Sequence, residues 1–210
     1  MSGSGRFIAL EGIDGSGTTT QTARLVEALE RHGTQALATC EPTAGPVGAF
    51  IRKALRRELR DEAGAPRTLP WSSMALLFAA DRLDHVDSVI RPALESGVTV
   101  VCDRYVLSSL TYQSATSPEG DGALPWIREL NARAVRPDVT IVLDVSPDVA
   151  RVRRMARGGP AELFEVDELQ RRLAALYARA ESLLPGDRVV HVVDGAPDDV
   201  AARVLAAAVT

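Results

Sequence analysis

A glycine-rich segment near the beginning of the chain has the residue types and spacing of an anion-binding loop. It reads Gly12-Ile-Asp-Gly-Ser-Gly-Thr-Thr19, and it follows a short apolar run and precedes a helical pattern. Glycines let successive backbone N–H groups point into one concavity, and the N-terminus of the next helix adds partial positive charge. A plain turn between a strand and a helix is the simpler explanation, but the order strand, loop and helix favours phosphate binding.

The segment departs from the usual phosphate-loop pattern at one position. That pattern is Gly-x-x-x-x-Gly-Lys-[Ser/Thr], in which the hydroxyl coordinates Mg²⁺ and the lysine reaches the β- and γ-phosphates. Thr19 fills the hydroxyl position, whereas Thr18 replaces the lysine and supplies no charge. Losing one preorganised transition-state donor costs about 10²–10³ in kcat. The loop therefore predicts phosphate binding without naming a substrate, through Gly12, Gly15, Ser16, Gly17, Thr18, Thr19 and Thr20.

Short apolar runs alternate with longer amphipathic stretches along the chain, and together they must position this loop. The runs predict strands at 6–10, 35–39, 98–102, 139–145 and 188–193. The amphipathic stretches predict helices at 18–32, 47–59, 71–96, 125–135, 147–157, 166–184 and 198–208, with Pro92 kinking or dividing the third. Segments 61–70 and 114–123 are predicted surface loops near a site. The alternation predicts an α/β fold with a five-stranded parallel sheet flanked by helices.

Composition limits the classes of function. A length of 210 residues suits one α/β domain, and a formal net charge of −4 argues against binding nucleic acid through a broad basic surface. No apolar run approaches the length of a membrane span, so no membrane partner is expected. Cys40 and Cys102 are predicted to be reduced core thiols rather than a disulfide, and the expected location is cytoplasmic.

Further motifs occur in order over nearly the whole chain, and together they resemble the thymidylate kinases. They are Phe7–Gly17, Glu41-Pro42-Thr43, Phe78-Ala-Ala-Asp-Arg82, Arg91–Gly97, Asp103-Arg-Tyr105 and Ser108–Gln113. The resemblance implies a P-loop nucleoside monophosphate kinase fold in a single domain over residues 1–210, with a lid at about 151–166. It also implies a homodimer.

The resemblance assigns the acceptor side of the site. Phe78 would stack on thymine, and Arg82, on the same helical face, would hydrogen-bond a base carbonyl. Arg104 would hold the acceptor phosphate with its guanidinium fork. A core aromatic and solvated surface arginines are the plainer alternatives. The full set implied to bind the acceptor is Glu41, Pro42, Phe78, Arg82, Arg104, Ser109, Tyr112 and Gln113.

The resemblance also assigns the metal and the transferred group. Thr19 and Asp103 would hold Mg²⁺, because a carboxylate at the carboxyl end of a strand commonly does so. Asp14 would act on Mg²⁺ and the transferred phosphoryl group, although aspartate is also favoured in turns for conformational reasons.

Three positions lack a cation that the family usually has near the transferred phosphate. Thr18 replaces the loop lysine, Cys40 stands where an arginine precedes Glu-Pro, and Leu163 occupies the arginine position of the lid. The helix that enters the lid offers a compensation. Its residues Arg153 and Arg157 share one face, and Arg151 and Arg154 share a neighbouring one. Arg153 and Arg157 are the predicted catalytic cations, with a solvated, ion-paired helix as the alternative.

The function predicted from all this is phosphorylation of dTMP to dTDP by ATP and Mg²⁺, in pyrimidine deoxynucleotide synthesis. The predicted catalytic residues are Asp14, Arg104, Arg153 and Arg157. Two alternatives remain open at this point. One is a kinase for another monophosphate such as dUMP, and the other is a catalytically silent nucleotide-binding protein.

Overall fold

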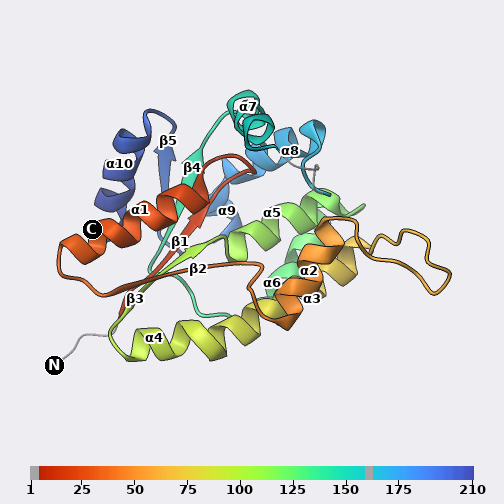
Figure 1. Cartoon of the computed structure of the whole chain (residues 1–210), viewed down its shortest axis with the longest axis horizontal. Helices are drawn as coiled ribbons and strands as arrows, with labels where there is room; N and C mark the ends of the chain where they lie inside the picture. The colour runs from red at the N-terminus through yellow and green to blue at the C-terminus, as the bar shows by residue number, and fades with distance from the viewer. Residues whose placement is uncertain (1–4, 159–162) are drawn as a thin grey trace.

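The computed structural model of the chain describes residues 5–158 and 163–210. Over these residues it contains a five-stranded parallel sheet in the order β2-β3-β1-β4-β5 (Figure 1). The strands are β1 (Phe7–Glu11), β2 (Ala36–Cys40), β3 (Thr99–Asp103), β4 (Val139–Asp144) and β5 (Val189–Val193). The predicted fold class is confirmed, and each predicted strand agrees with the observed one to within one residue at either end.

One face of the sheet is covered by α1 (Thr18–Arg31) and α10 (Pro197–Val209), the first and last helices. Leu25 and Leu29 of α1 and Val204 of α10 form one buried cluster with Leu10 of β1 and Ile141 of β4. Helix α1 leaves directly from the glycine-rich loop, so this packing fixes the direction of its N-terminus.

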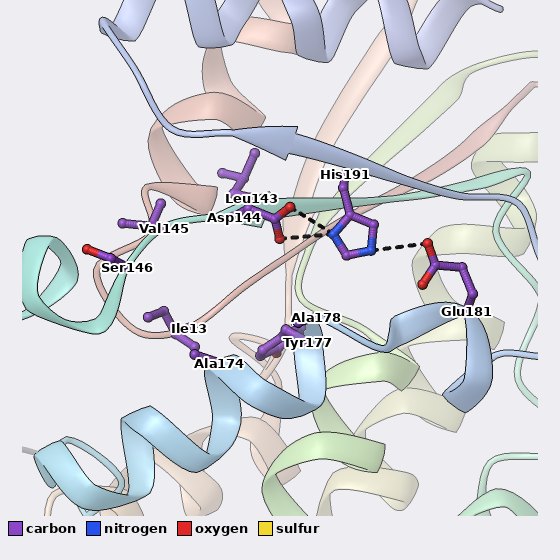
Figure 2. Close-up of a pocket in the computed structure, with 10 residues that line it drawn as sticks. All are labelled: Ile13, Leu143, Asp144, Val145, Ser146, Ala174, Tyr177, Ala178, Glu181 and His191. Atoms are coloured by element: carbon purple, nitrogen blue, oxygen red, sulfur yellow. Dashed lines mark hydrogen bonds and ion pairs between the residues drawn. The ribbon is translucent and has the colours of Figure 1, made fainter.

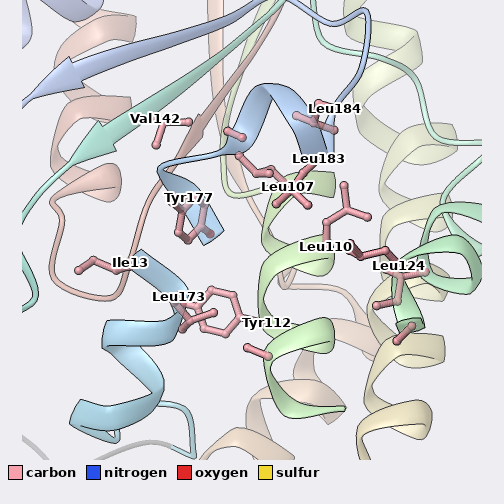
Figure 3. Packing of buried hydrophobic residues seen from close by; sticks show 14 of the residues in the cluster. Ile13, Leu107, Leu110, Tyr112, Leu124, Val142, Leu173, Tyr177, Leu183 and Leu184 are labelled. Carbon is pink, nitrogen blue, oxygen red and sulfur yellow. The ribbon is translucent and has the colours of Figure 1, made fainter. Parts of the chain in front are cut away.

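The opposite face carries most of the remaining helices. They are α3 (Trp71–His85), α4 (Arg91–Glu95), α5 (Val106–Thr116), α6 (Leu124–Leu130), α8 (Asp167–Tyr177) and α9 (Ala180–Leu183). Leu110 of α5, Leu124 of α6 and Leu173 of α8 share one buried cluster with Val142 of β4 (Figure 3). This cluster ties α8, which follows the lid, to the helix that begins just after β3.

Two further helices, α2 and α7, each follow the carboxyl end of a strand. Helix α2 (Pro46–Leu55) packs Ile51 and Leu55 against Met74 of α3. Helix α7 (Pro147–Arg157) begins at Ser146, whose hydroxyl accepts a hydrogen bond from the backbone N–H of Val149 and caps the helix.

The predicted helix 71–96 is divided, as Pro92 suggested. Helix α3 ends at His85, a π-helical turn follows at Val86–Ile90, and Pro92 lies in the first turn of α4. A proline is tolerated there because the first N–H groups of a helix have no intrahelical partner.

Other helix boundaries were predicted wrongly. The helix expected at 125–135 stops at Leu130, and the one expected at 166–184 is two helices, α8 and α9. The helix expected at 47–59 ends at Leu55. Helix α5 was not predicted, and residues 114–116 of the expected loop belong to it. Its buried side chains include serine, threonine and glutamine, so it lacks the apolar stripe that marks an amphipathic helix.

The register of the sheet brings three strand ends to one edge. Asp103, the last residue of β3, pairs with Leu10 of β1 and with Cys40, the last residue of β2. Ligands of open parallel sheets bind outside the carboxyl ends of the strands. The loop after Glu11, the segment from Glu41 and the turn at Arg104 therefore begin side by side.

Two valines on α10 test whether this core supplies the stability. Val204 is fully buried, whereas Val209 is 58% exposed on the same helix. We expect Val204→Ala to lower the free energy of unfolding by about 1–3 kcal/mol, because it removes apolar contacts and leaves a cavity. Val209→Ala should stay within about 0.5 kcal/mol of wild type. Urea denaturation measures both, and equal losses would contradict this packing.

Candidate active site

The loop between β1 and α1 is held in its shape by glycine at position 15. Gly15 has φ +89°, and a Cβ there would lie 2.5 Å from the carbonyl oxygen of Ala150 in α7. Helix α7 thus approaches the loop so closely that a side chain does not fit. The loop and the helix that enters the lid are in direct contact.

The loop hydroxyls differ in what they face. Thr18, at the position of the usual lysine, is buried in α1 with an exposed fraction of 6%. Thr19 is exposed, and its Oγ1 donates to Asp103 Oδ2 at 2.5 Å. Thr20, the last residue predicted to contact the donor nucleotide, is also exposed.

The donor set at this point fits a magnesium ion. Asp103 is only 8% exposed, and its Oδ1 atom has no hydrogen-bond partner among residues 5–158 and 163–210. The hydroxyl of Ser16 is also buried and, within the same residues, unpartnered. Mg²⁺ prefers hard oxygen ligands from one or two carboxylates together with substrate phosphates. Asp103 and Thr19 supply such oxygens next to the loop.

Asp14 and Arg104 join the loop to the end of β3. Arg104 Nη2 lies 2.7 Å from Asp14 Oδ1, and Nη1 donates to the carbonyl oxygen of Gly12 at 2.8 Å. Arg104 has φ +69°, a left-handed conformation that costs a non-glycine residue about 1–2 kcal/mol. Strain of this kind commonly occurs at functional sites. The turn here aims the guanidinium at the loop.

Glu11 is a buried residue that supports this turn. Its carboxylate accepts hydrogen bonds from the backbone N–H groups of Tyr105 and Ser108, at 2.8 and 3.1 Å. The hydroxyls of Ser108 and Tyr177 also donate to it. Burial raises the pKa of Glu11, and these donors offset part of that effect. The residue was not predicted, because a glutamate at a strand end carries no distinctive spacing.

A cavity of about 300 Å³ opens beside this pair and brings the predicted acceptor residues together. Its lining includes Glu41, Pro42, Phe78, Arg82, Arg104, Ser109, Tyr112 and Gln113. Asp14, Thr19 and Asp103, predicted to serve the donor and the metal, line the same cavity. Side chains from β2, α3, β3 and α5 therefore converge on one space at the edge of the sheet.

Arg82 is the most constrained side chain of this cavity, with an exposed fraction of 1%. Its Nη2 lies 2.7 Å from Glu41 Oε2 and donates to the Tyr105 carbonyl oxygen at 3.0 Å, while Nη1 donates to Ser109 Oγ at 3.0 Å. Nη1 also donates to Asn131. Over the described part of the chain, Arg82 Nε has no partner, and neither does Oε1 of Gln113. These two atoms are among the buried polar atoms of the lining residues that lack a partner in the described part of the chain, together with Asp103 Oδ1 and the hydroxyls of Tyr105 and Tyr112.

Two further lining residues, Arg52 of α2 and Phe164 in the turn before α8, were not predicted to contact a ligand. Arg52 of α2 donates to the carbonyl oxygens of Pro42 and Thr43, and its Nη2 lies 3.8 Å from Cys40 Sγ. Phe164 packs its ring 5.4 Å from that of Tyr112. Sequence periodicity could not have indicated Arg52, because tertiary packing decides which face of α2 meets the cavity.

Cys40 is not a core residue, which corrects the prediction for one of the two thiols. Its side chain is exposed and lines the cavity, whereas Cys102 is buried and donates to the Arg104 carbonyl oxygen at 3.0 Å. Strand β2 is an edge strand, so its last residue lacks a neighbour on one side. Neither cysteine is in a disulfide.

Arg154 is the arginine of the lid helix that contacts the loop. It is 8% exposed, and its Nη1 donates to the backbone carbonyl oxygen of Asp14 at 2.8 Å. Arg153 and Arg157, the predicted catalytic cations, contact other carboxylates instead of the loop. Arg153 Nη2 contacts both Asp194 oxygens at 3.0 Å, and Arg157 Nη2 lies 2.5 Å from Glu165 Oε1. Arg151 is exposed.

The lid itself is only partly described. Residues 159–162 of the predicted segment 151–166 lie outside the described residues. Leu163, at the position expected for an arginine, packs against the cluster formed by α2 and α3. Its backbone N–H donates to the Leu55 carbonyl oxygen at 2.9 Å. This end of the lid thus rests on α2.

A second cavity, of about 530 Å³, lies beside β4 and β5 (Figure 2). His191 Nδ1 lies 2.9 Å from Asp144 Oδ1, and its Nε2 lies 3.3 Å from Glu181 Oε1. These polar groups satisfy one another, and none of the predicted site residues lines this cavity. It is larger than the acceptor cavity, but the chemistry converges on the smaller one.

The fold and the site define a class of protein. These are the parts of a P-loop nucleoside monophosphate kinase: a parallel sheet with a phosphate loop after β1, a carboxylate and a hydroxyl beside that loop, and the acceptor cavity next to them. The chain belongs to the thymidylate kinase family, whose profile matches residues 10–198.

Relatives of the chain agree with this membership. A probable thymidylate kinase of Pyrococcus abyssi is 40% identical over 204 residues, which cover 95% of this chain and 96% of that protein. A probable thymidylate kinase of Pyrococcus horikoshii is 39% identical over 194 residues, covering 92% and 91%. A thymidylate kinase of Magnetococcus marinus is 41% identical over 168 residues, covering 79% and 76%. No helix of the described residues is long and apolar enough to cross a membrane.

The thiol of Cys40 gives a direct test of the cavity. Burial raises the pKa of Cys40, and the nearby Arg52 guanidinium offsets only part of this rise. The thiolate is the reactive form, so we expect slow alkylation by iodoacetamide at pH 7 that accelerates above pH 9. Saturating dTMP should slow the reaction because Cys40 lines the cavity. Mass spectrometry measures the rate, with Cys40→Ser as the control. A rate unchanged from pH 7 to 9 would contradict the environment described.

Proposed function

We propose that the protein transfers the γ-phosphoryl group of ATP to dTMP, giving ADP and dTDP. The observation that carries this proposal is that Arg82 Nε and Gln113 Oε1, on two residues that line the acceptor cavity, both lack a hydrogen-bond partner among the described residues. Thymine offers a carbonyl oxygen that can accept from Arg82 Nε and a ring N–H that can donate to Gln113 Oε1. A buried polar atom left unpaired costs about 1–3 kcal/mol, so a base with this pattern is strongly favoured. Phe78, which also lines the cavity, supplies a face on which the ring can stack.

The acceptor phosphate belongs at the loop end of the cavity. Arg104 lies there, and its guanidinium fork matches phosphate oxygens. Because Arg104 also contacts Gly12 and Asp14, a phosphate on Arg104 is held next to the donor site. An acceptor oxygen can then attack the γ-phosphorus in line, and ADP leaves from the opposite side without a covalent protein intermediate.

The donor phosphates are held by the backbone N–H groups of residues 15–19 at the N-terminus of α1. Asp103 and Thr19 would hold Mg²⁺, which neutralises charge on the β- and γ-phosphates. Asp14 contributes by fixing Arg104. The lid, at about 151–166 of a single domain, would close over the donor and exclude water as a competing acceptor.

The cations that replace the loop lysine come from α7 in this proposal. Arg154 is already at the loop, whereas Arg153 and Arg157 would have to leave Asp194 and Glu165 before reaching a phosphate. The sequence assigns the role of this cation to Arg153 and Arg157, whereas the geometry favours Arg154. The two assignments therefore make different predictions.

Assembly and location complete the proposal. Phe50 of α2, Leu76 of α3 and Trp126 of α6 are exposed on helices that adjoin one another, and they would form the apolar core of a homodimer interface. The two thiols outside any disulfide favour the reducing cytoplasm.

The first test is ADP production with Mg²⁺-ATP and a panel of dTMP, dUMP, ribo-TMP, dCMP, dGMP and AMP. We expect the highest kcat/KM with dTMP, and a value lower by about 10–200-fold with dUMP, because the pocket loses contact with one methyl group. The value for dCMP should be lower by about 10²-fold or more, because its amino group and unprotonated ring nitrogen oppose Arg82 Nε and Gln113 Oε1. A silent protein that binds dTMP, or equal turnover of dCMP, would contradict the proposal.

Single substitutions decide between the lid arginines. We expect Arg154→Met to lower kcat by about 10²-fold, the scale of one preorganised donor to the transition state. Arg153→Met and Arg157→Met should change kcat by less than about tenfold if their carboxylate partners keep them. Steady-state kinetics at saturating ATP and dTMP measures all three. The opposite ranking would return the role to Arg153 or Arg157.

A further inference from the structure

Gln170 of α8 is a polar residue at a position where the helix otherwise presents apolar side chains to the core. Positions 170, 173 and 177 share one face of α8, and Leu173 and Tyr177 are buried there. Gln170 has an exposed fraction of 0%. A buried amide is unfavourable unless it is fully hydrogen-bonded, so its partners show what it does.

The amide of Gln170 is hydrogen-bonded at both ends, and two of its three bonds go to one residue of the phosphate loop. Nε2 donates to Asp14 Oδ2 at 2.8 Å, and Oε1 accepts from the Asp14 backbone N–H at 3.1 Å. The other N–H donates to the Phe164 carbonyl oxygen at 2.8 Å. The side chain therefore joins the phosphate loop to the residue whose ring lines the acceptor cavity.

Asp14 is held by two cations in addition to this amide. Its Oδ1 lies 2.7 Å from Arg104 Nη2, and its carbonyl oxygen accepts from Arg154. Gln170 occupies the other carboxylate oxygen, so it fixes the rotation of the carboxylate about its Cα–Cβ and Cβ–Cγ bonds. That rotation determines whether Oδ1 faces Arg104, the proposed holder of the acceptor phosphate.

We infer that Gln170 is a positioning residue that couples the acceptor cavity to the phosphate loop by orienting the Asp14 carboxylate toward Arg104. The inference rests on the proposed function for its kinetic consequences. A nucleobase in the cavity contacts the wall that contains Phe164, and the Phe164 carbonyl oxygen is bound by the same amide that holds Asp14. Occupation of one nucleotide site is thereby transmitted to the other.

An isosteric acid and an apolar side chain at position 170 have different consequences. Gln170→Leu keeps the packing and removes all three hydrogen bonds. Gln170→Glu places a second carboxyl group beside Asp14, and two adjacent carboxylates cannot both ionise without repulsion. The protonated form can still donate to Asp14 Oδ2, so the Glu variant should function at low pH and fail as pH rises.

The charged groups around position 170 set the range of this titration. Arg104 lies on the far side of Asp14, and Arg154 lies between Asp14 and Asp167. Burial lowers the pKa of Arg104, but neighbouring carboxylates and phenols outweigh this effect and hold that pKa well above its usual value, so Arg104 remains charged throughout the range used. Burial raises the pKa of Tyr112 and of Tyr177, so both phenols stay neutral there.

The kinetic experiment measures kcat and KM for ATP and dTMP in the full-length protein. We expect Gln170→Leu to lower kcat by about 10–100-fold with both KM values within threefold. For Gln170→Glu, kcat should fall at least tenfold between pH 6 and pH 8.5, while wild type changes less than threefold. Gln21→Leu is the matched control: Gln21 is also buried, but its amide donates to the Pro197 carbonyl oxygen, and among the described residues no hydrogen bond joins its side chain to the acceptor cavity. It should keep the wild-type kcat.

A binding experiment separates this inference from the proposed function. Calorimetry measures dTMP affinity with and without a non-hydrolysable ATP analogue. Wild type should show coupling between the two affinities, and Gln170→Leu should reduce that coupling at least threefold while still binding each nucleotide. If wild type binds both nucleotides but shows no turnover, the proposed kinase activity is rejected. The role of Gln170 is then tested by the coupling between the two affinities alone.

Three results would overturn the role of Gln170. The first is a Gln170→Leu kcat within threefold of wild type, and the second is a Gln170→Glu pH profile that matches wild type. The third is coupling that survives in Gln170→Leu. Thermal denaturation of each variant confirms that a loss reflects the site, because a merely structural role would lower the melting temperature without a new pH dependence.

Discussion

The arrangement of the site depends on the ion pair between Asp14 and Arg104. The two residues are ninety positions apart, and they meet because β1 and β3 are neighbours whose carboxyl ends coincide. In the proposed function, the pair fixes the loop for the donor relative to the side chain for the acceptor. Phosphoryl transfer depends largely on positioning, so the placement of the loop relative to Arg104 matters more than any single group. Arg104 also adopts its left-handed backbone conformation here, which the Glu11 hydrogen bonds to the following turn help to maintain.

A fully buried ion pair, Arg82 with Glu41, would perform the same task for the base in the proposed function. Glu41 also accepts from His85 Nδ1 at 3.0 Å, and His85 Nε2 lies 2.7 Å from Thr39 Oγ1. Burying such charges costs several kcal/mol per ion, and the attraction only roughly repays it. The gain is therefore geometric, because a guanidinium with four partners is held in one orientation.

Much of the sheet, and the site residues at the ends of its strands, could be predicted from the sequence for a physical reason. Buried parallel strands are nearly continuous apolar runs, so their ends, and the Asp103, Arg104 and Glu41 that follow them, are visible locally. Arg52, Arg154 and Gln170 could not be found this way, because they reach the site from helices whose orientation only tertiary packing determines. The choice of Arg153 and Arg157 used helix periodicity correctly. Periodicity shows which residues share a face of a helix, but it does not show which face meets the loop.

Three arginines of α7 are paired with carboxylates, and in the proposed function they are the candidates to supply the charge of the missing lysine. Arg153, Arg154 and Arg157 each contact a carboxylate, namely Asp194, Asp167 and Glu165. These carboxylates hold the three side chains in place, and Arg154 among them contacts the loop, which reduces the entropy that this residue loses when a ligand binds. A triphosphate carries more negative charge than one carboxylate and accepts bidentate hydrogen bonds, so it can displace such a partner. Thr18 is buried and cannot supply this charge. In the proposed function, the cation at the transferred phosphate therefore comes from α7 rather than from the loop. Arg154, which already contacts the loop, needs the smallest rearrangement to supply it.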